Sequence, residues 1–173
     1  MGITARALPQ SNVRGSAVLI LVLLGTNPYS FERLARATDE YARTSGKEVF
    51  IQLGHTPYTP QCARYERFLT KQDLIKKIYD AELVITQGGF GSIAECLIAG
   101  KKVIAVPRKP DFNESPDRQE ELVRELERLG RVLGVYEVSE LPTAVEKVLT
   151  MEFKEGNLTT IPQLINKFLA GGN

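Results

Sequence analysis

Residues 83–95, Leu-Val-Ile-Thr-Gln-Gly-Gly-Phe-Gly-Ser-Ile-Ala-Glu, join three patterns in one short stretch. The first four residues are apolar or β-branched and predict a strand buried on both faces. The next five, Gln87 to Gly91, hold three glycines and predict a tight turn. A helix is expected from Ser92 to a stop at Gly100. A strand that passes through a glycine-rich turn into a helix is the repeating unit of a parallel α/β sheet.

The same alternation continues on both sides of this stretch. Strands are expected at 18–24, 48–53, 63–68, 83–86, 103–106 and 132–136, and helices at 30–44, 70–80, 92–99, 117–129, 141–149 and 161–169. This order predicts an α/β fold, a Rossmann-like doubly wound parallel sheet covered by helices on both faces. Ligands of such sheets bind at the carboxyl ends of the strands, where the strand order reverses. The loops after the first and fourth strands are therefore the expected site.

The chain has 173 residues, which suits one domain with a substantial core. We expect a flexible N-terminal extension over 1–16 and a single Rossmann-like domain over 17–173. The apolar run at 17–24 follows two arginines, as in a short signal peptide, but it lacks a small-residue cleavage site. It is also too short to span a bilayer. A buried parallel strand explains it better.

Composition excludes several classes of protein. A net charge of +1 argues against broad nucleic-acid binding. The two cysteines, Cys62 and Cys96, have no metal-binding spacing and are expected to be reduced and mostly buried. The single histidine, His55, is expected to be a solvated loop residue, with a direct catalytic role as the less favoured alternative. One histidine without a cysteine cluster predicts no metal site, and it gives no Ser/His/Asp set.

The glycine turn at 87–91 has more glycines than a tight turn needs. Backbone N–H groups without side chains, aimed by the positive end of the next helix, predict a phosphate site. A plain strand-to-helix turn is the alternative. Glu95 has two interpretations: with Ser92 it forms a capping box, or it accepts hydrogen bonds from a ribose diol. The spacing alone does not separate them.

Two other loops carry weaker signals. The loop Gly25–Ser30 precedes a helix and has amides and hydroxyls for a phosphate, but it lacks the Gly-Lys-Ser/Thr ending of a P-loop. Ser115 and Pro116 suit the first positions of a helix. Asp117 and Gln119 then either belong to that helix start or contact sugar hydroxyls.

A dinucleotide fingerprint is also present. Gly89-x-Gly91-x-x-Ala94 matches GxGxxA, which normally follows the first strand and is paired with an acid after the second. Here it follows the fourth strand, and the next strand ends in Val106-Pro-Arg108. A nicotinamide-dependent oxidoreductase is therefore disfavoured.

Taken together, these segments resemble the MurG-type C-terminal domain of glycosyltransferase family 28, and above all its free-standing versions in two-part N-acetylglucosaminyltransferases of dolichol-linked and exopolysaccharide pathways. The resemblance covers roughly residues 18–149. It implies the C-terminal-type half of a GT-B glycosyltransferase. The segments that carry it are Leu24-Gly-Thr26, residues 74–95, Gly100 to Pro107, and Asp117-Arg-Gln119.

The resemblance implies roles for individual residues. Gly25 and Thr26 would lie near the diphosphate of a UDP-sugar, and Leu69 would face the uracil. Glu95 would hold the ribose hydroxyls, and Asp117 and Gln119 would touch the donor sugar. The diphosphate itself would lie in the turn formed by Gln87, Gly88, Gly89, Gly91 and Ser92. Relatives often carry His or Arg where this chain has Gln87, which leaves the stabilisation of the leaving group to the helix terminus or to a partner residue.

The resemblance also implies partners. The expected reaction is inverting transfer of a sugar, with N-acetylglucosamine preferred over glucose or galactose, from a UDP-sugar to a lipid-linked acceptor, without a required cofactor. A membrane-anchored subunit would bind the acceptor and supply the catalytic base. The chain would then be cytoplasmic and peripherally recruited to the membrane by that partner. A nucleotide-sugar-binding regulatory subunit without turnover is the main alternative.

Overall fold

The computed structural model describes residues 19–151, so the expected extension over 1–16 and the expected helix at 161–169 lie outside it. The strands are β1 (Leu19–Leu23), β2 (Glu48–Gln52), β3 (Arg64–Glu66), β4 (Leu83–Gln87), β5 (Lys102–Val106) and β6 (Leu133–Gly134). The α-helices are α1 (Glu32–Ser45), α2 (Lys71–Asp80), α3 (Phe90–Ile98), α4 (Glu120–Arg128) and α5 (Leu141–Thr150). Two short 3-10 helices, Pro110–Phe112 and Val138–Glu140, lie in the connections.

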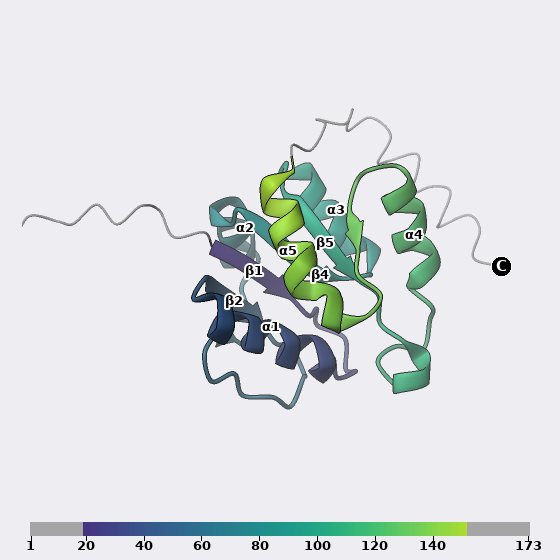
Figure 1. Ribbon diagram of the computed structural model, residues 1–173. Coiled ribbons are helices and arrows are strands. Elements are labelled where there is room, and N and C mark those ends of the chain that lie inside the picture. Colours follow the sequence, from purple (N-terminus) through teal and green to yellow (C-terminus); the bar gives the residue numbers. More distant parts are fainter. Residues whose placement is uncertain (1–18, 152–173) are drawn as a thin grey trace, which may run out of the picture.

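The strands form one sheet in the order β3-β2-β1-β4-β5-β6, and every neighbouring pair is parallel. From β1 the chain first builds outward through β2 to β3. It then crosses back, and β4, β5 and β6 build outward on the other side (Figure 1). The order therefore reverses between β1 and β4, which confirms the expected doubly wound sheet.

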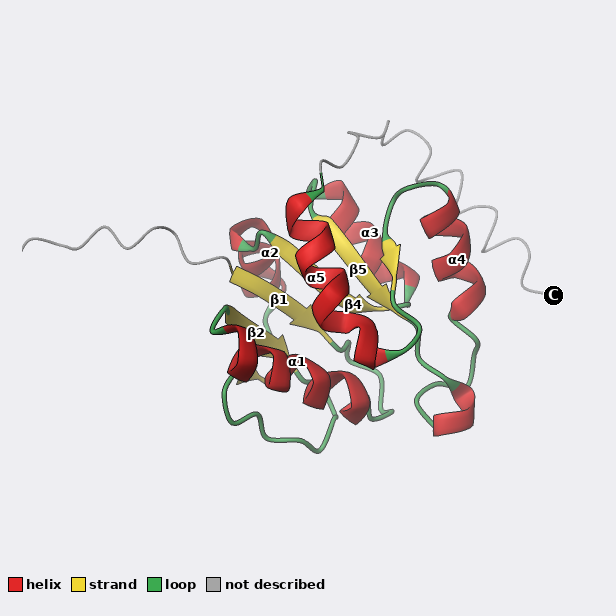
Figure 2. Cartoon of the chain, viewed as in Figure 1, coloured by secondary structure: helices red, strands yellow, loops and turns green. Residues whose placement is uncertain are grey.

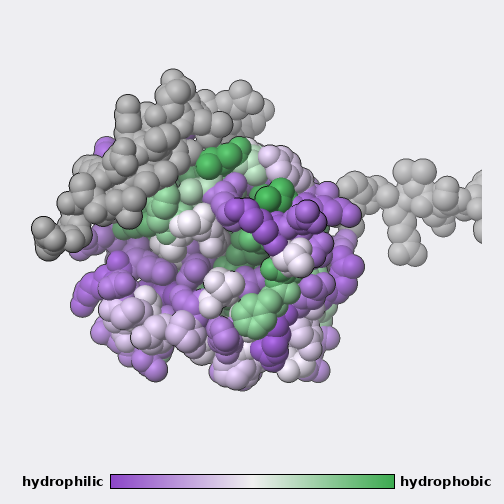
Figure 3. Space-filling model, turned by 180° about the vertical axis from the view of Figure 1, so that it is seen from behind, coloured by the Kyte–Doolittle hydropathy of each residue, from purple (hydrophilic) through white to green (hydrophobic). Residues whose placement is uncertain are grey.

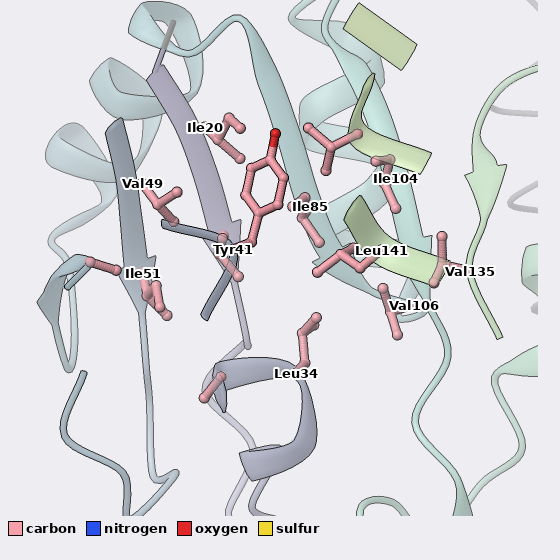
Figure 4. Close-up of a cluster of buried hydrophobic side chains, with 14 of the residues drawn as sticks. Ile20, Leu34, Tyr41, Val49, Ile51, Ile85, Ile104, Val106, Val135 and Leu141 are labelled. Atoms are coloured by element: carbon pink, nitrogen blue, oxygen red, sulfur yellow. The ribbon is translucent and has the colours of Figure 1, made fainter. Parts of the chain in front are cut away.

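The helices cover both faces of the sheet. α1 and α5 lie on one face of the sheet, and α2, α3 and α4 lie on the other (Figure 2). The buried apolar side chains of the two groups of helices belong to two separate core clusters. Figure 4 shows Leu34 and Tyr41 of α1 and Leu141 of α5 against strand residues such as Ile85. Figure 3 shows the opposite face, where apolar side chains lie between hydrophilic ones.

The apolar run near the N-terminus becomes the centre of the sheet. β1 pairs with β2 on one side and with β4 on the other. From Ile20 to Leu24 no residue is more than 3% exposed. Within β1, Ile20 and Val22 face α1 and α5, and Leu21 and Leu23 face the other helices. The strand interpretation of this run is confirmed within the described residues.

Three helices begin at other residues than predicted. α3 begins at Phe90 with Gly89 at the N-cap position, two residues before the expected Ser92. α4 begins at Glu120 instead of Asp117, because Ser115 closes a local turn: its Oγ accepts the Asp117 N–H at 3.2 Å. α1 begins at Glu32, two residues after the start at Ser30 that the sequence predicts.

The actual N-cap residue of α1 is Phe31, whose N–H donates to Thr56 Oγ1 at 3.0 Å. The expected Thr70 cap of α2 is confirmed, because Thr70 Oγ1 accepts the Asp73 N–H at 3.1 Å. The start of α1 is therefore stabilised by Thr56, a residue of a distant loop.

The last strand is shorter than expected. β6 covers two residues, and Glu127 of α4 bonds beside it. Its carboxylate accepts the Gly134 N–H and the Tyr136 hydroxyl, both at 2.9 Å. Within residues 19–151, no helix has the length and apolar character needed to cross a bilayer.

Asp39 of α1 fixes the connection between β2 and β3. Its carboxylate accepts the N–H groups of Gln61, Cys62 and Ala63 at 2.8–2.9 Å and the Tyr58 hydroxyl at 2.8 Å. Burial by itself raises the pKa of Asp39, but these hydrogen bonds outweigh it and hold the pKa below its ordinary value. β3, which follows, is exposed along its whole length.

Candidate functional site

The carboxyl ends of β1 and β4 lie side by side, with Leu23 beside Thr86. The two predicted loops therefore meet, and Gln87 lies between them. Gly25 has a φ of +84°, and a Cβ placed on it would lie 2.3 Å from Gln87 Nε2. The residue must be glycine both for its backbone conformation and to leave room for the Gln87 amide.

The first loop is held by a side chain of β2. Gln52 Oε1 accepts the Gly25 N–H at 3.1 Å, and Gln52 Nε2 donates to the Gly25 carbonyl at 3.0 Å. The amide of Gly25 is thus already occupied. The loop presents Thr26, the next residue and an exposed one, as a group for a ligand.

The glycines of the second loop serve different purposes. A Cβ on Gly88 would lie 2.9 Å from Val123 Cγ2 of α4 and 3.0 Å from Pro107 Cα, so packing requires a glycine there. A Cβ on Gly91 would have no heavy atom within 4 Å. Packing therefore does not explain Gly91, whereas a ligand that approaches the backbone would.

The start of α3 is an open helix terminus. No side chain caps it. The N–H groups of its first turn, those of Phe90, Gly91 and Ser92, have no intrahelical acceptor and carry the positive end of the helix dipole. Gly91 and Glu95 are four residues apart and both exposed, so they share one outward face of α3.

The capping-box interpretation of Glu95 is wrong. Ser92 is the third residue of α3 and not its cap, and the helix has no side-chain cap hydrogen bond. No group among residues 19–151 bonds to the exposed Glu95 carboxylate. That carboxylate is free to accept hydrogen bonds from a ligand.

Arg108, directly after β5, is the residue that sequence reasoning missed. It is 2% exposed, and its Nε donates to Gln87 Oε1 at 2.6 Å. Its guanidinium lies 4.6 Å from the centre of the Phe31 ring. The other acceptors are the carbonyls of Leu24 (2.6 Å), Glu114 (2.8 Å), Tyr29 and Ser30 (both 3.1 Å). The signal in the sequence is a cationic residue directly after a buried strand, in Val106-Pro-Arg108.

Arg108 keeps its charge in this setting. Burial lowers the pKa of Arg108 to about 10, while Glu114 opposes and Arg33 adds to that shift. The Glu114 carboxylate is 6% exposed and is engaged by Arg33 Nε at 2.9 Å. Arg33 Nη2 also donates to the Pro107 carbonyl at 2.9 Å, while its Nη1 is buried without an acceptor in the described part of the chain. The two arginines and one glutamate together retain a net positive charge.

The expected sugar-contacting residues lie on the loop after β5. Gln119 Oε1 accepts the Arg108 N–H at 3.0 Å, and Gln119 Nε2 lies 3.7 Å from where a Cβ of Gly89 would be. The structure thus brings Gln119 to the glycine turn. Asp117, two residues earlier, is exposed. Leu69 is half-buried after β3 and packs on the core under α2, α3 and α4.

The cysteines and the histidine lie apart from these contacts. Both cysteines are free, as expected. Cys96 is buried, and burial raises its pKa to about 12, whereas Cys62 is exposed, against expectation. His55 is exposed, with its ring edge-on to Phe68 at 5.0 Å. Among residues 19–151, no three His, Cys, Asp or Glu side chains are grouped so that they could hold a metal ion.

Comparison with models of protein families matches residues 19–166 to the glycosyltransferase family 28 C-terminal domain. The chain belongs to this family. The match covers all six strands, the glycine turn and the loop that carries Gln119. A search of curated protein sequences finds no match.

Solved structures agree with this family 28 assignment at the level of the fold. The glycotransferase of kitacinnamycin matches with a TM-score of 0.65 and 17% identity, over 96% of this chain and 43% of its own. SnogD, a glycosyltransferase from Streptomyces nogalater, matches with a TM-score of 0.63 and 17% identity, over 96% of this chain and 44% of its own. The calicheamicin glycosyltransferase CalG4 matches with a TM-score of 0.59 and 19% identity, over 93% of this chain and 40% of its own. The chain spans less than half the length of these structures and has the fold of a C-terminal GT-B half.

Proposed function

We propose that this family 28 domain binds the nucleotide-sugar donor of an inverting glycosyltransferase, which moves a sugar from a UDP-sugar to a lipid-linked acceptor. One observation carries the proposal. The uncapped start of α3 lies where the strand order reverses, and the unpaired carboxylate of Glu95 lies one turn further on the same helix face as Gly91.

The diphosphate would lie at the start of α3. Its charge grows as the sugar leaves, and fixed N–H dipoles stabilise such charge without rearrangement. The first-turn amides of α3 supply these dipoles, and the open space at Gly91 lets a phosphate reach them. This chemistry requires no metal from the chain.

The nucleoside would follow along α3. Glu95 lies about 5.4 Å, one helical turn, beyond the first-turn amides, which suits a ribose attached to the inner phosphate. Its carboxylate accepts hydrogen bonds from the two ribose hydroxyls. Leu69 would contact the uracil, and Asp117 with Gln119 would contact the sugar; N-acetylglucosamine is the sugar that the resemblance favours.

The acceptor and the catalytic base would come from a second polypeptide. The chain covers 43% of the kitacinnamycin enzyme. The resemblance to the free-standing subunits of two-part transferases is what supports a separate partner. A membrane-anchored partner would supply the acceptor-binding half and recruit this domain to the cytoplasmic face of the membrane.

Ligand-observed NMR tests the donor proposal. UDP and UDP-N-acetylglucosamine should bind the wild-type protein, and Glu95→Ala should weaken both at least about tenfold, as expected for lost hydrogen bonds to a charged group. Glu121→Ala, which removes an exposed glutamate of α4, is the matched control and should bind like the wild type. Binding of NAD without UDP would instead establish a dinucleotide enzyme and overturn the proposal.

The neutral Gln87 keeps a regulatory subunit as the second candidate. Such a subunit would bind the UDP-sugar but would not contribute to its chemistry. Reconstitution with the acceptor-binding partner separates the two. Glu95→Ala should raise the KM for the donor at least about tenfold if this chain holds the reacting donor, and should leave the KM for the donor unchanged if it only regulates.

A further inference from the structure

The side chain of Arg108 fixes the direction of the Gln87 amide. A guanidinium has only donors, so the group it contacts at 2.6 Å must be the carbonyl oxygen Oε1. Nε2 then has to face the other way. It lies 2.3 Å from the Cβ position of Gly25 and 3.3 Å from that of Gly89, between the two loops of the site. No described residue accepts a hydrogen bond from it, so this N–H₂ group is open to a ligand.

The backbone of Arg108 orients a second amide in the same way. Its N–H donates to Gln119, so that oxygen too must be Oε1. Gln119 Nε2 consequently faces the glycine turn, 3.7 Å from the Cβ position of Gly89. Two side-chain N–H₂ groups therefore converge on Gly89, and one residue determines the direction of both.

Arg108 also places charge behind these donors. Its guanidinium is nearly inaccessible to water, and Glu114, the acid close to it, is already bonded to Arg33. In a region of low dielectric a cation bonded to Oε1 polarises the amide and strengthens donation from its N–H₂ group. A neutral Gln87 can in this way convey positive charge to an anion that it touches.

We propose that Arg108 is the positioning residue of the diphosphate site, acting through Gln87 and Gln119. It aims both amides at the start of α3 and supplies the positive charge that the Gln87 side chain lacks. This inference rests on the donor-binding function proposed above. It adds that the side-chain amides of Gln87 and Gln119, oriented by Arg108, bind the phosphates.

The test compares UDP with uridine, which has the same base and ribose but no phosphate. Arg108→Lys keeps the charge and removes the planar fork that orients Gln87. We expect the ratio of UDP to uridine affinity, measured by NMR titration, to fall at least about tenfold with little change for uridine. Arg33→Lys is the matched control, because Arg33 joins the same loops but touches neither glutamine; it should lower the melting temperature and leave the ratio unchanged.

A double-mutant cycle tests whether Arg108 acts through Gln87. Gln87→Met alone should reproduce the loss of the phosphate-dependent affinity, and adding Arg108→Lys should weaken UDP binding by much less than it does in the wild-type background. If the losses of UDP affinity in the two single variants simply add in the double variant, Arg108 does not act through Gln87, and the proposal is overturned. In the wild-type protein the side-chain amide signals of Gln87 and Gln119 should shift with UDP and not with uridine, a measurement that needs no variant to fold.

The outcomes separate the two proposals. Wild-type protein that binds UDP, with the ratio unchanged in Arg108→Lys or with unshifted glutamine signals, overturns the role of Arg108 and leaves the donor function standing. Wild-type protein that binds neither UDP nor a UDP-sugar overturns the donor function and this inference with it.

Discussion

The carboxylate of Asp39 holds the second half of the connection from β2 to β3. It accepts hydrogen bonds from three backbone N–H groups and one hydroxyl. Residues 58–63 form no helix or strand, so these hydrogen bonds position the chain just before β3. Asp39 is buried within α1, and no short motif marks it in the sequence.

Asp39→Asn should lower the free energy of unfolding by about 2 kcal/mol near neutral pH, because one of its N–H₂ donors would then face backbone donors. The pKa of Asp39 is held below its ordinary value of 3.8 in the folded state. The stabilisation is therefore complete above that value and is lost as the pH falls through the lower, folded pKa. Urea unfolding of the two proteins from neutral to acid pH measures this.

The difference between wild type and Asp39→Asn should shrink in acid. Asp111→Asn, at an exposed position, serves as the control and should cost little at any pH. A difference that stays constant down to strongly acid pH would show that the charge of Asp39 does not matter.

At this scale the sequence was a good guide to the glycine turn and a poor one to Arg108. Several glycines close together in the sequence indicate by themselves a backbone conformation or a close approach that other residues would not allow. The role of Arg108 depends on carbonyls at Leu24 and Glu114, which only the folded sheet brings together. A long side chain that bonds to several loops has partners at no regular separation in the sequence, so its contacts could not be predicted from a motif.

α2 and α3 begin in opposite ways, although the sequence predicts that each begins at a hydroxyl residue, Thr70 or Ser92. Thr70 caps α2, whereas α3 starts at Phe90 with its first amides open. A cap at α3 would occupy the amides that the proposed ligand needs. The cap of α2 stabilises the fold, whereas the uncapped start of α3 leaves amides available for the proposed ligand.

Thr70→Ala should lower the free energy of unfolding by about 1 kcal/mol, the usual cost of losing an N-cap. Ser92→Ala should change it by less than about 0.5 kcal/mol, since Ser92 lies inside the first turn and caps nothing. Denaturant titrations of both variants give the comparison. Equal losses at the two positions would mean that Ser92 caps α3 after all.

Element boundaries were predictable only where the signal is local. Gly46 ends α1 in a left-handed conformation, as expected from the sequence. The start of α1 involves instead Thr56, 25 residues further along the chain, which accepts the Phe31 N–H, and α4 begins only after the local turn that Ser115 closes. Periodicity gives the type of an element more securely than its limits.

For the whole molecule, alternation along the sequence predicted a parallel doubly wound sheet, and the structure confirms it. The order of the strands was not contained in that pattern, because alternation fixes neither which strand lies beside β1 nor the direction of each crossover. The burial of β1 on both faces and both edges makes it the most enclosed part of the fold.

Native-state hydrogen exchange should reveal this arrangement. Amides of β1 and β4 should exchange only through global unfolding, while those of β3, which is exposed and paired on one side, should exchange through local opening. Exchange measured over a series of sub-denaturing urea concentrations distinguishes the two routes. Equal protection of the β3 and β1 amides against hydrogen exchange would contradict this prediction.

The lengths of the outermost strands have a consequence for assembly. The sheet ends in β3, with three residues, and in β6, with two. Such short borders offer another backbone almost nothing to pair with, and proteins use them to avoid polymerising edge to edge. The partner subunit proposed above would therefore contact the domain through side chains and not by strand addition. A variant with a longer edge strand is expected to aggregate more readily than the wild type.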